Sequence, residues 1–186
     1  MCDSRISNIQ DVLTTLKVGN DKFLNAKTSC GDVSLDIRKS TFINGQKPFA
    51  VVISCSDSRV IPESIFSAGI GDLFVIRVVG NVVDNTVIAS VEYAVSHLNV
   101  PLVVVLGHTG CGAVNTAISG QASGLIKTTI DKISSVIGDE KDDYTATRLN
   151  VNAGVTEVKK VLAGNDKVKV VGAVYFGDSG VVEFFN

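Results

Sequence analysis

Four short runs of almost uninterrupted apolar residues constrain the fold of this chain more than any other feature. They are rich in β-branched residues and span Phe49 to Ser54, Leu73 to Val78, Leu102 to Leu106 and Val168 to Phe176. A strand that is apolar at successive positions is buried on both faces, as in parallel sheets covered by helices. A further run, Val181 to Phe185, follows the turn residues 177–180 and predicts a strand that pairs antiparallel with the fourth.

Segments with helical periodicity separate these runs. The expected helices are Ile6 to Asn25, Ser34 to Phe42, a short one from Pro62, Asp84 to Leu98, Ala113 to Ser119, Leu125 to Ile137 and Tyr144 to Ala163. The alternation predicts an α/β fold, with an open, mostly parallel sheet of about four strands plus an antiparallel C-terminal strand, flanked by helices. With 186 residues and no visible linker, we expect one domain over 1–186, made of an N-terminal helical arm (1–47) and an α/β core (48–186).

Charge and hydropathy argue against several classes of partner. The formal net charge is −2 with mixed signs, so we expect no binding to nucleic acid or to an anionic membrane. The first residues lack the apolar run of a secretory signal, and no run reaches the roughly 18 residues that span a bilayer, so we expect a cytoplasmic protein. There, isolated thiols are more often metal ligands, nucleophiles or inert core residues than disulfides, and we expect Cys2 and Cys30 to be functionally silent.

Residue types that bind metals follow two of the predicted strands. The first run ends in Cys55, Asp57 and Arg59, separated by serines, and the third is followed by His108 and Cys111. The functional site of an open α/β sheet lies off the carboxyl ends of its strands, so we expect these side chains to lie together. Cys55, His108 and Cys111 form a Cys₂His set, which suits a catalytic zinc with an open fourth position.

The surroundings of the second motif strengthen the zinc hypothesis. Gly107, Gly110 and Gly112 permit the backbone angles of a tight His-x-x-Cys turn. Cys111 precedes a predicted helix, whose partial positive charge favours the thiolate. The alternative for the metal is a closed structural zinc with Asp57 as a permanent fourth ligand.

Other polar residues carry weaker predictions. An ordinary ion pair, worth little when exposed, is the alternative for Asp57 and Arg59. Arg77 lies at the end of the second run, next to its last residue, where an arginine is more often a structural or solvated charge than a functional one. His97 lies in the last turn of a predicted helix, where a cation suits the dipole, and we favour that interpretation over a proton shuttle.

The segment Cys55 to Val60, followed at this distance by His108-Thr109-Gly110-Cys111-Gly112, closely resembles the motifs of the β-class carbonic anhydrases. The resemblance covers nearly the whole chain, including Asn20 to Phe23, the lead-in from Gly45 to Pro48, and Phe74 to Asp84. The chain departs from the family at 176–177, where many members carry a more acidic turn.

The resemblance implies reversible hydration of carbon dioxide to bicarbonate and a proton, through attack of a zinc-bound hydroxide on carbon dioxide in an apolar pocket. It implies that Cys55, His108 and Cys111 hold Zn²⁺, that Asp57 accepts a hydrogen bond from the zinc-bound water or hydroxide, and that Arg59 orients Asp57. Release of Asp57 would let it ligate the zinc and close the site, so activity should rise with pH. Relatives form dimers or larger assemblies that complete the pocket, so we expect a homodimer or a dimer-based oligomer.

Three other functions would use the same residues. A related zinc enzyme could act on another small linear electrophile such as carbon disulfide, since pocket shape decides the substrate. A non-catalytic zinc or bicarbonate-binding module would have no need of Arg59 to control Asp57. A cysteine hydrolase built on Cys55 and His108 would leave Cys111 without a role. The glycine spacing matches no dinucleotide or phosphate-binding loop, so we predict no nucleotide site.

Overall fold

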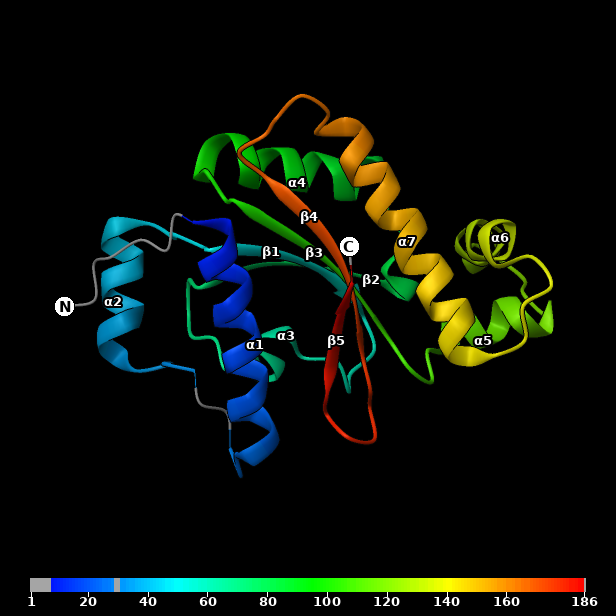
Figure 1. The fold of residues 1–186 in the computed structure, drawn as a ribbon, viewed down its shortest axis with the longest axis horizontal. Coiled ribbons are helices and arrows are strands. Elements are labelled where there is room, and N and C mark those ends of the chain that lie inside the picture. Colours follow the sequence, from blue (N-terminus) through cyan, green and yellow to red (C-terminus); the bar gives the residue numbers. More distant parts are fainter. Residues whose placement is uncertain (1–7, 29–30, 186) are drawn as a thin grey trace.

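A computed structural model describes residues 8–28 and 31–185. Within these residues, five strands form one sheet in the order β2-β1-β3-β4-β5 (Figure 1). The strands are β1 (Ala50–Cys55), β2 (Leu73–Val78), β3 (Leu102–His108), β4 (Lys169–Tyr175) and β5 (Val182–Phe185). The first four run parallel and β5 pairs antiparallel with β4, which confirms the predicted fold class.

The helices lie close to their predicted positions. They are α1 (Ile9–Asn25), α2 (Leu35–Asn44), α3 (Pro62–Ile65), α4 (Asn85–Leu98), α5 (Gly112–Ser119), α6 (Ile126–Ile137) and α7 (Asp143–Val161), with a 3-10 turn, η1 (Val79–Asn81), after β2. The expected start of the first helix at Ile6 lies outside the described residues, and the observed N-cap is Asn8. β3 continues beyond its predicted end at Leu106 and includes His108.

Helices cover both faces of the sheet (Figure 1). On one face, Leu16 of α1 and Ile65 of α3 pack with Val52 of β1. On the other, Val91 of α4 packs with Val51, and Val155 of α7 belongs to the same cluster. This two-sided burial explains why β1 is apolar at successive positions.

A third apolar cluster lies beyond the carboxyl ends of β1 and β3. It combines Cys55 and Cys111 with Val114 of α5, Ile133 of α6 and Ala146 of α7. Helices α5 and α6 form the lobe on the right of Figure 1, against the start of α7. This edge of the sheet is therefore partly enclosed by protein.

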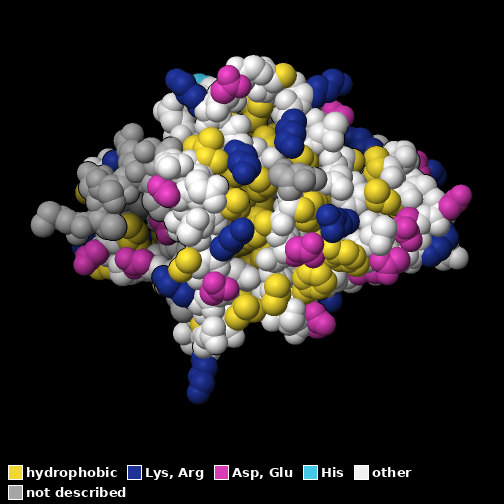
Figure 2. Space-filling view, viewed as in Figure 1, with side chains coloured by type: hydrophobic (Ala, Val, Ile, Leu, Met, Phe, Trp, Pro, Cys, Tyr) yellow, Lys and Arg dark blue, Asp and Glu magenta, His cyan; other side chains and the backbone are white. Residues whose placement is uncertain are grey.

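The N-terminal helices differ in how they pack. Helix α1 buries Val12, Leu13 and Leu16 against the sheet, whereas α2 has no buried residue. Phe42 and Ile43 of α2 are 90% and 77% exposed. Over the face shown in Figure 2, basic and acidic side chains are interspersed among apolar ones. No described helix combines the length and the apolar character needed to cross a membrane.

Candidate metal centre

The candidate site lies where the topology of the sheet changes direction. The chain runs from β1 out to β2 and then crosses back, so that β3 lies on the other side of β1. In such sheets a crevice forms at the carboxyl ends of the two strands that flank the reversal. Ser54 of β1 lies opposite Leu106 of β3, so Cys55 and His108 end neighbouring strands at the same edge.

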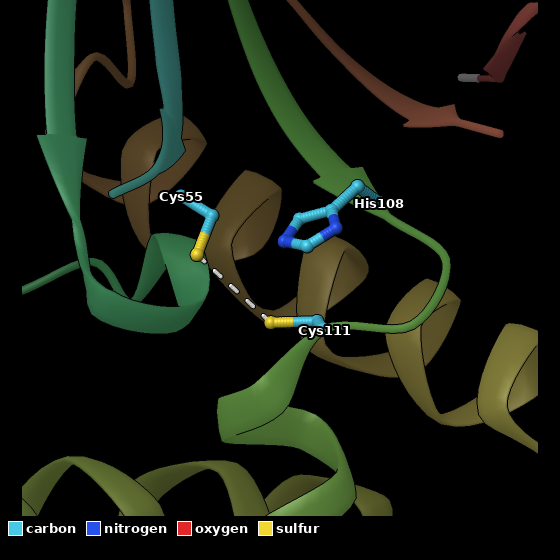
Figure 3. A group of neighbouring side chains, drawn as sticks. All are labelled: Cys55, His108 and Cys111. Carbon is cyan, nitrogen blue, oxygen red and sulfur yellow. Dashed lines mark hydrogen bonds between the residues drawn. The ribbon is translucent and has the colours of Figure 1, made fainter. Parts of the chain in front are cut away.

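The structure brings Cys55, His108 and Cys111 together, as the sequence predicts (Figure 3). Their candidate ligand atoms all lie within 4.8 Å of one another, and the Sγ atoms of the two cysteines are 4.0 Å apart. Two sulfurs bound tetrahedrally to one zinc at about 2.3 Å would lie about 3.8 Å apart. All three side chains are buried, with no more than 5% of any residue exposed. The spacing therefore fits a zinc ion with little rearrangement.

The imidazole of His108 is oriented as a metal ligand would be. Its Nδ1 lies 3.1 Å from the carbonyl oxygen of Thr109, which can only accept a hydrogen bond, so Nδ1 carries the proton. The lone pair is then on Nε2, which is buried and has no hydrogen-bond partner in the described part of the chain. A buried nitrogen without a partner is costly unless something else binds it. A metal ion at Nε2 would satisfy it.

The two thiols affect each other's protonation. Contact with Cys111, joined by two backbone amides, lowers the pKa of the Cys55 thiol to about 4, against the opposing effect of burial. The same contact, together with burial, raises the pKa of Cys111. One sulfur of the pair is therefore a thiolate at neutral pH, which is the form that binds metals.

The sulfur of Cys55 accepts hydrogen bonds from the backbone. The amides of Asp57 and Gly80 lie 3.4 and 3.3 Å from Sγ. Gly80 has a positive φ of 65°, and an added Cβ would lie 2.8 Å from Cδ1 of Ile133, so the position requires glycine. Its carbonyl oxygen in turn accepts a hydrogen bond of 2.8 Å from Nδ2 of the buried Asn150. Neither Gly80 nor Asn150 was predicted to be part of the site, because no local sequence pattern gives them that role.

The three glycines of the His-x-x-Cys turn have different roles, contrary to the expectation that all of them supply unusual backbone angles. Only Gly110 has a positive φ, of 65°. At Gly107 an added Cβ would lie 2.6 Å from Cγ2 of Val151, so this glycine allows the close approach of α7 to β3. Gly112 has no atom near its Cβ position and no positive φ.

Asp57 and Arg59 form a two-point ion pair beside the thiols. Nε and Nη2 of Arg59 lie 2.9 and 2.7 Å from the two carboxylate oxygens of Asp57. The guanidinium holds the pKa of the Asp57 carboxyl well below its usual range, so that group stays ionised. Arg59 Nη2 also donates to the carbonyl oxygen of Gly110 at 3.1 Å. The pair is therefore tied to the His-x-x-Cys turn, which an isolated surface ion pair would not be.

Two other polar residues considered from the sequence, Arg77 and His97, do not take part in the candidate site. Arg77 donates to the carbonyl oxygens of Cys55 and Asp57 at 3.2 and 2.6 Å, so it fixes the end of β1, a structural role. His97 stacks on Tyr93 at a centroid distance of 5.0 Å, at the end of α4 that leads into the start of β3 and away from the candidate site. The expectations for Cys2 and Cys30 fall outside the described residues.

Comparison with known proteins agrees with this geometry. A family model described as carbonic anhydrase matches residues 50–182. Carbonic anhydrase 2 of Mycobacterium tuberculosis is 49% identical over 111 residues, which cover 60% of this chain and 53% of that protein. The alignment therefore spans about half the length of that relative.

Two further proteins match over most of their length. A carbonic anhydrase of Mycolicibacterium smegmatis is 35% identical over 185 residues, covering 90% of this chain and 89% of the relative. Among solved structures, a tetrameric β-carbonic anhydrase of Sordaria macrospora superposes with a TM-score of 0.69 at 27% identity, covering 82% of this chain and 87% of that one.

Proposed function

Because the chain belongs to the β-class carbonic anhydrase family, we propose that it catalyses the reversible hydration of carbon dioxide to bicarbonate and a proton at a zinc site. We propose Cys55, His108 and Cys111 as the three protein ligands. The observation that carries the proposal is the convergence of two buried thiols and an unpartnered imidazole nitrogen at the reversal point of the sheet. This donor set fits a catalytic zinc, which keeps one position open.

Zinc bound by this set would supply a Lewis acid that lowers the pKa of a water molecule and makes it a nucleophile near neutral pH. The protein contributes Asp57, whose ionised carboxylate can accept a hydrogen bond from the reacting water and orient it. Arg59 holds that carboxylate at two points, so Asp57 is kept in one orientation. Because folding has already fixed the orientation of this carboxylate, less orientational entropy is lost when the water reacts, and the barrier is lower.

Arg59 is also placed to control access to the site. While both carboxylate oxygens are bonded to Arg59, Asp57 is not free to become a fourth ligand. Loss of this pair would release Asp57 toward the cysteines and close the open position. We expect activity to rise with pH, because a water molecule on the zinc would compete better with Asp57 for the open position as it loses its proton. Flat activity down to acid pH would contradict this gate.

The proposal is tested by stopped-flow hydration of carbon dioxide on zinc-loaded protein from neutral to alkaline pH, with zinc content measured in parallel. Cys55→Ser should lose both zinc and hydration, whereas Cys30→Ser serves as the matched cysteine control and should keep both. Zinc retention without hydration would contradict the proposal and favour a non-catalytic module. Faster turnover of carbon disulfide than of carbon dioxide would favour the related zinc enzyme that acts on another small linear electrophile.

We further propose that the chain works as a homodimer or a larger dimer-based assembly. Helix α2 buries none of its residues yet exposes Phe42 and Ile43, and β2 is an edge strand that is only half-buried. Apolar surface of this kind is typical of an interface, and the Sordaria macrospora relative is tetrameric. The cytoplasmic location stays a prediction.

Light scattering tests the assembly. Replacing Phe42 and Ile43 together with serine should reduce the measured mass toward that of one chain. Leu125→Ser, at another apolar residue that is 96% exposed, is the control and should leave the mass unchanged. A wild-type chain that is monomeric and fully active would contradict the proposal.

A further inference from the structure

One carboxylate from α7 holds the turn that carries two of the proposed ligands. Oδ2 of Asp143 accepts a hydrogen bond of 2.8 Å from the backbone amide of Gly110. The carbonyl oxygen of Gly110 accepts from Arg59 at 3.1 Å. Gly110 lies between His108 and Cys111, so the turn is held on one side by a carboxylate and on the other by a guanidinium.

Stability alone does not account for this arrangement. Helix α7 already has an N-cap, Asp142, whose side chain accepts the amide of Thr145 at 2.9 Å. The other oxygen of Asp143, Oδ1, is buried and has no hydrogen-bond partner among residues 8–28 and 31–185. A buried carboxylate oxygen without a partner costs free energy, and a charge near the helix N-terminus could be supplied from an exposed position instead.

We propose that Asp143 is a positioning residue for the zinc centre, which it supports by fixing Gly110 and thereby the separation of His108 and Cys111. The inference rests on the proposed function and adds to it a residue from α7 that is not itself among the three candidate ligands. Groups that orient metal ligands typically change metal affinity about 10- to 100-fold when removed. A site whose ligand-carrying turn is held in place should release zinc slowly.

Three substitutions separate the hydrogen bond from the charge. Asp143→Ala removes both, Asp143→Asn keeps an acceptor oxygen in place without the charge, and Asp143→Glu keeps the charge but moves the acceptor by one methylene. Asp139→Ala, at an exposed carboxylate just before α7, is the matched control. The measurements are the rate of zinc transfer to an excess of a chromogenic chelator, the visible spectrum of the cobalt(II)-loaded protein, and thermal melting.

We expect zinc loss to be about tenfold faster in Asp143→Ala and clearly faster in Asp143→Glu, with Asp143→Asn and Asp139→Ala near wild type. The cobalt spectrum should change in the same two variants. If Asp143→Ala does not fold, the contrast between Asp143→Glu and Asp143→Asn makes the same test.

Two results would overturn the inference. If Asp143→Ala and Asp143→Asn lose zinc equally fast, the charge matters and the hydrogen bond does not. If wild-type protein retains zinc and hydrates carbon dioxide, but neither Asp143→Ala nor Asp143→Glu loses zinc faster, this inference fails while the proposed function stands. A wild-type chain that binds no zinc would overturn both.

Discussion

Asn150 of α7 tests how the structure supports the metal centre from a distance. The residue is 6% exposed, and its Nδ2 donates to the carbonyl oxygen of Gly80 at 2.8 Å. The amide of Gly80 lies 3.3 Å from Sγ of Cys55. Asn150→Leu replaces the amide with an apolar side chain of similar length, so the main loss is the hydrogen bond and not packing volume.

The size of the effect follows from the carbonyl group that is left behind. A buried acceptor that loses its hydrogen-bond donor costs about 1–3 kcal/mol. With a urea m-value of about 2 kcal/mol/M, the midpoint of unfolding should fall by about 0.5–1.5 M. Because the same turn carries the amide that contacts Cys55, we also expect zinc to be lost faster.

Equilibrium unfolding in urea, followed by circular dichroism at one protein concentration, measures the change. Asn152→Leu is the control, because Asn152 lies on the same helix, is half-buried and makes no side-chain hydrogen bond within the described structure. If the midpoints of the two variants agree, the Gly80 carbonyl does not depend on Asn150, and the reasoning is wrong.

Three further predictions concern the site and the fold. Arg59→Lys, which cannot make the two-point contact with Asp57, should lower hydration about 10- to 100-fold while zinc content stays the same. Gly19→Ala should lower stability by about 1–3 kcal/mol in calorimetry, although alanine favours helices, because the new Cβ would overlap the carbonyl oxygen of Phe66. A backbone amide lowers the pKa of the N-cap Asp142, so its stabilisation is present at neutral pH and lost as pH falls through the folded pKa. Asp142→Asn should therefore show a smaller loss of thermal stability between neutral and acid pH than wild type.

The fold could be predicted from sequence because burial on both faces leaves a strong pattern. β1 and β3 are apolar at nearly every position, which only a sheet covered on two sides requires. The end of β3 could not be predicted, since Gly107 and His108 are not typical strand residues. Their extended conformation depends on pairing with Val174 and Tyr175 of β4, and that pairing is a tertiary contact.

The candidate ligands could be predicted for a different reason. Cysteine and histidine directly after two apolar runs are a local signal, and parallel topology brings the ends of those runs together. Asn150 and Asp143 give no such signal, because they are ordinary polar residues of a helix far along the chain. Arg77 was expected to be a structural or solvated charge, and its contacts with two backbone carbonyls show which of these it is.

Backbone amides that point at the cysteine sulfurs affect how acidic a water molecule at the proposed centre can be. Two thiolates neutralise the formal charge of Zn²⁺, so sequence alone suggests weak activation of water. In the structure, the amides of Asp57 and Gly80 donate to Cys55, and those of Ala113 and Val114 lower the pKa of Cys111. Each donor withdraws negative charge from a sulfur, so the thiolates would cancel less of the charge of the metal. The acidity of the centre therefore depends on amides placed by the turn after β1, by η1 and by the start of α5, which the ligand motif does not specify.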